Sequence, residues 1–196
     1  MDYKQATYSC WLLQSLDKEK PNPYTDQSLS SVFIDLSLIA NRVIAEGSGI
    51  GFNTVYDDDD IEASPLPGWF RSKVADANSA LLVAFGTTGA PVGALTLAHS
   101  LNSDRGAAKR HRVDIQCFFT DPRLRHQGVG SLLLSMADHY ARRLSSHVTI
   151  LTLDARSTQK SAISLYKQAG YKLWGTFDDY AIGETLVVMY ELQLML

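Results

Sequence analysis

Residues 125–131, with the sequence RHQGVGS, carry the residue types of an anion-binding turn. A strand-like apolar pattern, VDIQCFFT over residues 113–120, closely precedes this segment, and an amphipathic pattern predicts a helix that begins near Gly128. The first N–H groups of a helix have no intrahelical acceptor, and the helix dipole places partial positive charge there. Two glycines let a ligand approach the backbone closely, and Arg125 adds a full positive charge. The segment therefore predicts a phosphate-binding turn.

Other phosphate and metal motifs do not fit the chain. No Gly-Lys-Ser/Thr follows the turn, which excludes a Walker loop, and residue 133 is Leu where a dinucleotide fingerprint has its third glycine. Taken alone, a Gly-x-Gly at a helix start is also typical of an ordinary strand-to-helix connection. The five histidines show no ligand spacing with cysteines or acids, so we expect no metal site.

The elements that must position the turn are predicted from apolar periodicity. We expect a strand at 6–15, a helix that starts at Asp26 or Ser28 and stops at Gly47, and strands at 79–85, 91–99 and 113–120. A helix from about 128 to 144, a strand at 148–155, a helix that ends at Gly170 and two final strands follow. Residues 47–72 are predicted to be irregular, either as a lid or substrate loop or as a plain connection. This order indicates one α/β domain over residues 1–196.

Two motifs in this chain resemble the GNAT superfamily of acyl-CoA-dependent N-acetyltransferases. Arg125, Gly128 and Gly130 match the pattern Gln/Arg-x-x-Gly-x-Gly/Ala at a strand-to-helix junction, and LYKQAGY at residues 165–171 matches a second element of that family. The strong matches span residues 113–175. The resemblance implies an α/β (α+β) fold with a mixed, mostly antiparallel seven-stranded sheet and helices on both faces. It also implies that a central pair of strands, 113–120 and 148–153, splays apart.

The resemblance further implies acetyl-CoA as co-substrate and assigns residues to it. Backbone N–H groups of the turn would hold the pyrophosphate, and the end of the preceding strand would bind the pantetheine arm through its main chain. Gln159 replaces the asparagine that the family often carries seven residues before its tyrosine. The residues expected to bind acetyl-CoA are Phe118, Phe119, Thr120, Arg125, His126, Gln127, Gly128, Val129, Gly130, Ser131 and Gln159.

Catalysis in this family is direct transfer to an amine. The resemblance makes Tyr166 the candidate that protonates the departing thiolate, although its place on an apolar helix face also suits a core aromatic. Asp114 is the candidate base, since Gln116 on the same strand cannot titrate; alternatively Asp114 is a cross-strand partner of a nearby arginine. Bulk water is the alternative acceptor for the proton.

The acceptor is predicted from charge. Asp57 to Asp60 with Glu62, and Asp178 with Asp179, form acidic patches that would attract an ammonium group. The stretch at residues 151–181 resembles antibiotic and toxin N-acetyltransferases, which favours a small cationic amine as acceptor. A protein N-terminal or lysine acetyltransferase and a non-catalytic acyl-CoA-binding module remain as alternatives. A solvated acidic loop is the plain interpretation of residues 57–62.

Composition bounds the remaining functions. The net charge of −3 and the lack of aromatic residues among Lys109 to Arg112 argue against a nucleic-acid partner. No apolar run approaches a membrane span, and the first residues do not resemble a secretory leader, so we expect a cytoplasmic protein without a membrane partner. The apolar end, LVVMYELQLML, is compatible with a homodimer contact or with a last strand.

Overall fold

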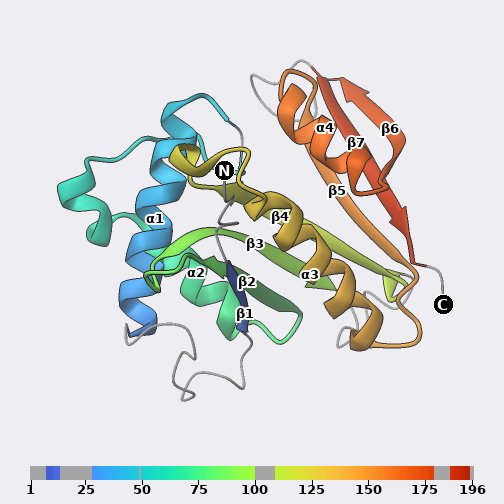
Figure 1. Ribbon diagram of the computed structural model, residues 1–196, viewed down its shortest axis with the longest axis horizontal. Helices are drawn as coiled ribbons and strands as arrows, with labels where there is room; N and C mark the ends of the chain where they lie inside the picture. Colours follow the sequence, from blue (N-terminus) through green and yellow to red (C-terminus); the bar gives the residue numbers. More distant parts are fainter. Residues whose placement is uncertain (1–7, 14–27, 49, 100–108, 179–185, 195–196) are drawn as a thin grey trace, which may run out of the picture.

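The computed structural model describes residues 8–13, 28–48, 50–99, 109–178 and 186–194. Seven strands form one sheet in the order β1-β2-β3-β4-β5-β7-β6 (Figure 1). All neighbouring strands are antiparallel except β4 and β5, which are parallel. The strands are β1 (Ser9–Leu13), β2 (Ser79–Phe85), β3 (Pro91–His99), β4 (Arg112–Thr120), β5 (Ile150–Arg156), β6 (Lys172–Asp178) and β7 (Leu186–Gln193).

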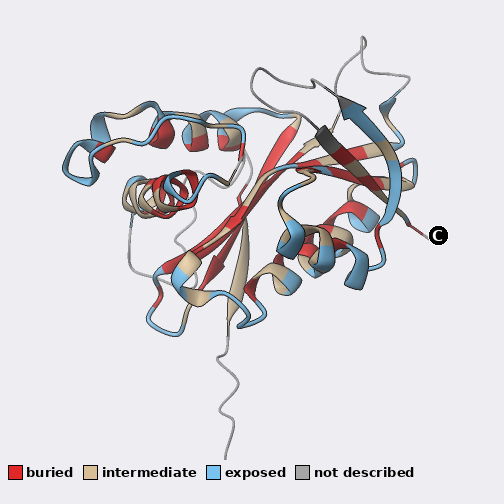
Figure 2. Ribbon diagram, turned by 90° about the horizontal axis from the view of Figure 1, so that it is seen from above, coloured by how far each residue is buried: buried red, intermediate tan, exposed pale blue. Residues whose placement is uncertain are grey.

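Helices cover both faces of the sheet, as predicted (Figure 2). On one face, α1 (Leu29–Ala45) and α2 (Pro65–Ala75) pack on alternate residues of β2, among them Leu81 and Val83. On the other face, α3 (Val129–Leu144) and α4 (Lys160–Gln168) share a core with the intervening residues, among them Leu82 and Ala84. This alternation follows from the two-residue period of a strand, which sends successive side chains to opposite faces.

Helix α1 begins and ends where its local sequence predicts. The Ser28 hydroxyl oxygen accepts a hydrogen bond from the backbone N–H of Ser31 at 3.2 Å, which caps the first turn. Gly47 follows the helix with a φ of +76°, a conformation that glycine adopts without strain. Asp26, the other predicted cap, lies outside the described residues.

Residues 47–72 contain more helix than the predicted irregular segment. A short 3-10 helix, η1 (Asp58–Ala63), leads directly into α2. The Ser64 hydroxyl oxygen accepts from the N–H of Leu66 at 3.3 Å, and Pro65 occupies the first helical position. Proline fits there because its missing N–H would have no intrahelical acceptor. The prediction missed α2 because its prolines and glycine obscure the apolar period.

The predicted splay of the central strands is confirmed. β4 and β5 pair only at Arg112↔Ile150, Val113↔Leu151 and Asp114↔Thr152. β4 continues for six residues beyond its last pair, to Thr120. Near this point Cys117 has a φ of +46°, and the register with β3 shifts, as in a β-bulge. The carboxyl ends of the two strands therefore diverge, and no other strand of the described part of the chain pairs with β4 on that side.

Candidate active site

One cavity of about 1040 Å³ lies at the divergent ends of β4 and β5. Its walls come from the end of β4, the turn at residues 124–131, the length of α4, and the end of α1 with the segment that follows it. The predicted site residues that line it are Phe118, Phe119, Thr120, Arg125, His126, Gly128, Val129, Gly130, Ser131, Gln159 and Tyr166. The fold thus brings most of the predicted site together. Its size suits a large ligand, since small-molecule sites commonly enclose about 300–1,000 Å³.

The turn before α3 has the geometry of an anion-binding site. Gly128 is the residue before the helix, with a φ of +86°, and no side chain among the described residues caps the N–H groups of the first turn. Those groups therefore remain available to a ligand. A Cβ atom at position 130 would lie only 2.8 Å from Cδ2 of Leu165, so glycine lets α3 and α4 pack closely there without a shift of the Leu165 side chain.

Gln127 belongs to this turn but is placed differently from its neighbours. Its side-chain oxygen accepts a hydrogen bond at 2.7 Å from the Tyr8 hydroxyl, which ties the turn to the chain before β1. Its side chain thus anchors the turn. Binding of a phosphate by the Gln127 backbone N–H stays a prediction.

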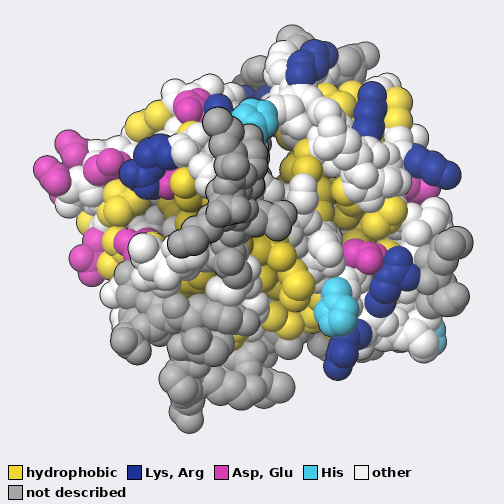
Figure 3. Space-filling view, viewed as in Figure 1, with side chains coloured by type: hydrophobic (Ala, Val, Ile, Leu, Met, Phe, Trp, Pro, Cys, Tyr) yellow, Lys and Arg dark blue, Asp and Glu magenta, His cyan; other side chains and the backbone are white. Residues whose placement is uncertain are grey.

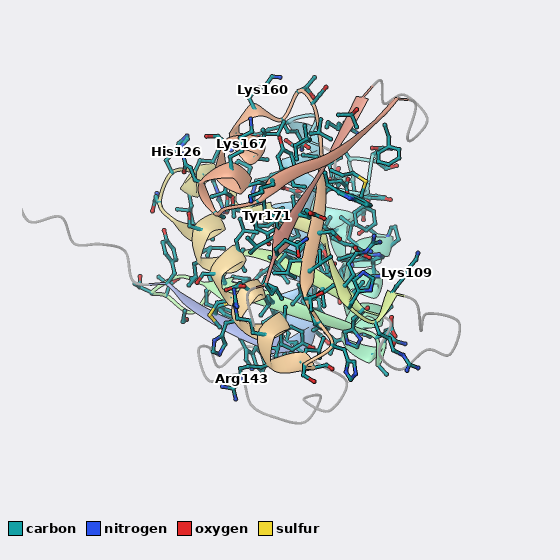
Figure 4. The ribbon with its side chains drawn as sticks, turned by 90° about the vertical axis from the view of Figure 1, so that its right-hand side faces the viewer. Lys109, His126, Arg143, Lys160, Lys167 and Tyr171 are labelled. Atoms are coloured by element: carbon teal, nitrogen blue, oxygen red, sulfur yellow. The ribbon has the colours of Figure 1, made fainter. Side chains whose placement is uncertain are left out.

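Basic side chains surround the mouth of the cavity. Arg125 forms an ion pair with Glu46, which follows α1. Figure 4 shows His126, Lys160 and Lys167 at the same end of the molecule, far from Arg143 and Lys109. This end therefore carries the positive charge that an anionic ligand requires.

Asp121 fixes the approach to the turn. Arg123 donates to its carboxylate at 2.6 Å and Arg42 of α1 donates at 3.2 Å. Burial alone would raise the pKa of Asp121, but the hydrogen bonds from Arg123 and the charges of both arginines outweigh it and lower this pKa. These bonds hold α1, the end of β4 and the turn as one unit.

Tyr166 lies on α4 at the cavity and is only 5% exposed. Its ring stacks on Phe118 with centroids 6.1 Å apart and meets Tyr190 edge-on at 5.9 Å. Burial raises the pKa of the Tyr166 hydroxyl, and the negative charge of Asp154 raises it further. The hydroxyl is therefore fully protonated near neutral pH and is able to donate a proton.

Asp114 is held in a polar contact between strands. Arg112 Nε lies 2.9 Å from Asp114 Oδ1, and the Thr152 hydroxyl donates to the same oxygen. Among the described residues, those that line the cavity do not include Asp114. The arginine partner lies on the same strand, two residues away, and not across the strands as the alternative interpretation expected. A role of Asp114 as base stays a prediction.

The acidic run at residues 57–62 lies apart from the cavity. Asp57 caps η1 by accepting from the N–H of Asp59 at 3.1 Å, and Asp58 accepts from the buried amide of Asn41 at 2.8 Å. Figure 3 shows acidic side chains gathered at the left edge of the molecule, where Figure 1 draws the segment between α1 and α2. Two of these carboxylates therefore have local structural partners. The side chains of Asp178 and Asp179 lie outside the described residues.

Sequence reasoning missed the wall that closes the cavity beside α1. Glu46, Gly47 and Ile50 line it. Arg156, at the end of β5, holds this wall by donating to the backbone oxygen of Gly47 and to Asn53 Oδ1, both at 3.3 Å. The glycine-rich sequence GSGIGF marked the segment as irregular, but the contact with Arg156 joins positions about a hundred residues apart.

The arrangement suits a phosphorylated ligand with a long flexible arm. The turn offers N–H groups to phosphates, the unpaired edge of β4 offers main-chain hydrogen bonds to an extended arm, and Tyr166 offers a proton at the inner end. Such a ligand matches coenzyme A and its thioesters. The described residues contain no group of three or more metal-ligating side chains. No described helix has the length and apolar composition that crossing a membrane requires.

Comparison with known proteins agrees with this arrangement. The sequence model of the acetyltransferase (GNAT) family matches residues 45–171, more than half of the chain. The match includes β4, the turn before α3, and α4. No curated protein sequence is significantly similar to the chain.

Solved structures share the whole architecture at low sequence identity. An N-acetyltransferase from Staphylococcus aureus Mu50 has a TM-score of 0.68 at 18% identity, over 97% of this chain and 100% of that one. The protein yncA from Salmonella typhimurium, solved with its cofactor acetyl-CoA, has a TM-score of 0.65 at 16% identity, over 96% and 94%. RimL, a ribosomal L7/L12 alpha-N-protein acetyltransferase solved with coenzyme A, has a TM-score of 0.63 at 17% identity, over 86% and 91%. At these identities the structures establish the fold alone. The family match shows that the chain belongs to the GNAT family of acyl-CoA-dependent N-acetyltransferases.

Proposed function

We propose that this enzyme transfers the acetyl group of acetyl-CoA directly to the primary amine of a small cationic molecule of the antibiotic, amino sugar or polyamine type. The observation that carries the proposal is that the open turn before α3, the unpaired end of β4 and the hydroxyl-bearing Tyr166 line one cavity.

Acetyl-CoA would lie along the cavity from the turn to Tyr166. The N–H groups of residues 127–131 hold the pyrophosphate, with Arg125 and His126 beside it. The main chain of residues 118–120 pairs with the amide groups of the pantetheine arm, in the manner of an added strand. Gln159 lies at the start of α4 and lines the cavity, and its side-chain oxygen accepts from the N–H of Arg156 at 3.0 Å.

The reaction needs no covalent enzyme intermediate. The amine nitrogen forms a bond to the thioester carbonyl carbon, the carbon–sulfur bond breaks, and the sulfur leaves as a thiolate that takes the Tyr166 proton. The nitrogen loses one proton to solvent, and a solvent proton restores the Tyr166 hydroxyl. Burial keeps the Tyr166 hydroxyl protonated at neutral pH, so a proton is present at the site when the thiolate departs, although the raised pKa also makes this hydroxyl a weaker acid.

The small size of the acceptor is supported by the wall beside α1. Arg156 anchors this wall to β5 and Glu46 anchors it to the turn. The small size of the acceptor is otherwise inferred from the resemblance of residues 151–181 to antibiotic and toxin N-acetyltransferases. The likeness to RimL, which is named for a ribosomal protein N-terminus, keeps a protein acceptor as the second candidate.

A panel of acceptors tests the proposal. The release of the CoA thiol is measured with acetyl-CoA and, in separate reactions, aminoglycosides, polyamines, amino sugars, and peptides with free N-termini or lysines. Turnover with small amines well above that with peptides supports the proposal. Turnover with peptides alone would assign the enzyme to protein N-termini or lysines. Tight acetyl-CoA binding without turnover would favour a non-catalytic acyl-CoA-binding module.

A further inference from the structure

We infer that Tyr8, just before β1, is a positioning residue for acetyl-CoA: its hydroxyl holds the turn before α3 in the conformation that binds the pyrophosphate. The inference rests on the proposed function, because it concerns how that same turn receives the cofactor. It adds a residue from the far edge of the sheet, which belongs neither to the two GNAT motifs nor to the walls of the cavity.

Strand β1 brings Tyr8 to the face of the sheet on which α3 lies. Trp11 and Leu13 pack in the core with α1 and α2, whereas Cys10 and Leu12 pack against the core with α3 and α4. Tyr8 continues the second set with the two-residue period of a strand and packs against the same core. The ring is therefore held by packing, and the hydroxyl at its end reaches the turn.

The contact between Tyr8 and the turn is a single hydrogen bond. The Tyr8 hydroxyl donates to the side-chain oxygen of Gln127 at 2.7 Å, and the two residues are 119 positions apart in the chain. Gln127 does not line the cavity, whereas His126 and Gly128 on either side of it do. The bond therefore holds the turn from outside the cavity and leaves the ligand space open.

The backbone of this turn needs such support. Among the described residues other than glycine, only Cys117 and His126 have a positive φ, and that of His126 is +63°. An L-residue in this left-handed region is disfavoured by the contact of its Cβ with the backbone, and it persists where the surrounding structure holds it. Gly128, with a φ of +86°, has no Cβ and meets no such cost. His126 is thus the residue of the turn that would relax if its neighbours were released.

Both neighbours of His126 are held by residues from elsewhere in the fold. Arg125 forms an ion pair with Glu46, and Gln127 accepts the bond from Tyr8. The ion pair lies in the cavity wall, where a bound phosphate would compete with Glu46 for Arg125. The Tyr8 bond lies outside the wall, so it is the contact that stays intact when the ligand binds.

The expected effect follows from the population of the binding conformation. Without the Tyr8 bond, the cost of the left-handed conformation at His126 lets a share of the free molecules adopt another turn. Only the fraction with the binding turn takes acetyl-CoA, so the apparent Kd rises by the inverse of that fraction. We expect a rise of about 3- to 10-fold for Tyr8→Phe, the range that loss of one hydrogen bond commonly gives. Because Tyr8 does not line the cavity, kcat at saturating acetyl-CoA should stay within about twofold of wild type.

The test measures the Kd of acetyl-CoA by calorimetry for the full chain and for Tyr8→Phe and Gln127→Met. Each variant removes one partner of the bond, so each should raise Kd about 3- to 10-fold, and the double variant should raise it no further than the larger single effect. Tyr56→Phe is the matched control, because it removes the hydroxyl of a tyrosine that does not line the cavity. It should keep the wild-type Kd.

Substitutions at residue 126 separate support of the strained backbone from other roles of Tyr8. His126→Gly removes the cost of the left-handed conformation, so in that background Tyr8→Phe should change Kd by less than about twofold. His126→Ala removes the imidazole but keeps an L-residue at the same φ, and there the full effect of Tyr8→Phe should remain. Each comparison is made within one background, so a direct contribution of the imidazole cancels.

A folded Tyr8→Phe protein with the wild-type Kd would overturn the inference, whether or not its melting temperature falls. An equal effect of Tyr8→Phe in the His126→Gly background would also overturn it. The readout is binding, so the Kd effects above without acetylation of any amine would support this inference and refute the proposed acceptor. A wild-type Kd in Gly130→Asp would instead show that acetyl-CoA binds elsewhere, and this inference would fail together with the proposed placement of the cofactor.

Discussion

Substitution at Gly130 tests the cofactor turn more sharply than any other change. A Cβ added to the backbone at this position would lie 2.8 Å from Leu165 Cδ2 and 3.6 Å from Phe118 Cζ, and both residues line the cavity. The Leu165 contact is with the far end of a flexible side chain, so the protein is expected to fold after a small shift. Because Gly130, Leu165 and Phe118 all line the cavity, we expect a longer side chain at position 130 to enter the space that acetyl-CoA would occupy.

The magnitude follows from charge and volume. In Gly130→Asp a carboxylate would lie near the pyrophosphate, and two like charges about 4 Å apart repel by about 4 kcal/mol at an effective dielectric constant of about 20. That is an increase of about 1,000-fold in Kd. Gly130→Asn has the same shape without the charge and isolates the steric part. Gly130→Ala, which adds only the Cβ, should weaken binding least.

Thermal melting with acetyl-CoA measures the effect. At about 100 times the wild-type Kd, binding stabilises the protein by about 2.7 kcal/mol, which raises the melting temperature by roughly 5–10 °C for a chain of this size. At the same concentration Gly130→Asp should gain less than about 0.1 kcal/mol. A folded Gly130→Asp protein with the full wild-type shift would show that acetyl-CoA does not bind at this turn.

Three further changes probe the residues around the site. Tyr166→Phe should lower turnover at least about tenfold with little change in acetyl-CoA affinity, measured by thiol release and by thermal shift, and unchanged turnover would remove Tyr166 as proton donor. Asn41→Ala should cost roughly 2–3 kcal/mol in thermal unfolding, because it leaves the N–H and C=O of Tyr56 without the partners that now lie at 2.9 Å; a melting temperature equal to wild type would contradict this. Because the pKa of Asp121 is lowered in the folded protein, its ionised carboxylate stabilises the fold above about pH 5, and this stabilisation is lost as the pH falls below about 4. Asp121→Asn should therefore flatten the decline of the melting temperature in acid. An equally steep decline in this variant would refute the assignment.

The parts of the fold that follow from local sequence were predicted. Ser28 caps α1, Gly47 and Gly170 follow helices with positive φ, and the turn at residues 125–131 opens α3. Each of these depends on neighbouring residues alone, so a pattern a few residues long is sufficient. The splay of β4 from β5 came from resemblance to the GNAT family, because no local pattern records where two strands stop pairing.

The parts that were missed depend on contacts distant in sequence or on a weak period. Helix α2 starts with Pro65 and Pro67, which hide its apolar face, although Pro65 is well placed at the first turn. The bond from Arg156 to the wall at Gly47 has no signature in either segment. For Asp114 the alternative expectation was a cross-strand arginine, but the folded structure shows that Arg112 on the same strand and Thr152 on the neighbouring strand both bind it.

The central claim is that this protein moves an acetyl group from acetyl-CoA to a small amine. The most direct measurement is thiol release from acetyl-CoA with and without each amine, with mass spectrometry of the amine in the same reaction. We predict thiol release that depends on the amine and matches, mole for mole, an amine product that carries one added acetyl group. Amine-independent thiol release, or none with every small amine while peptides are acetylated, would contradict the account.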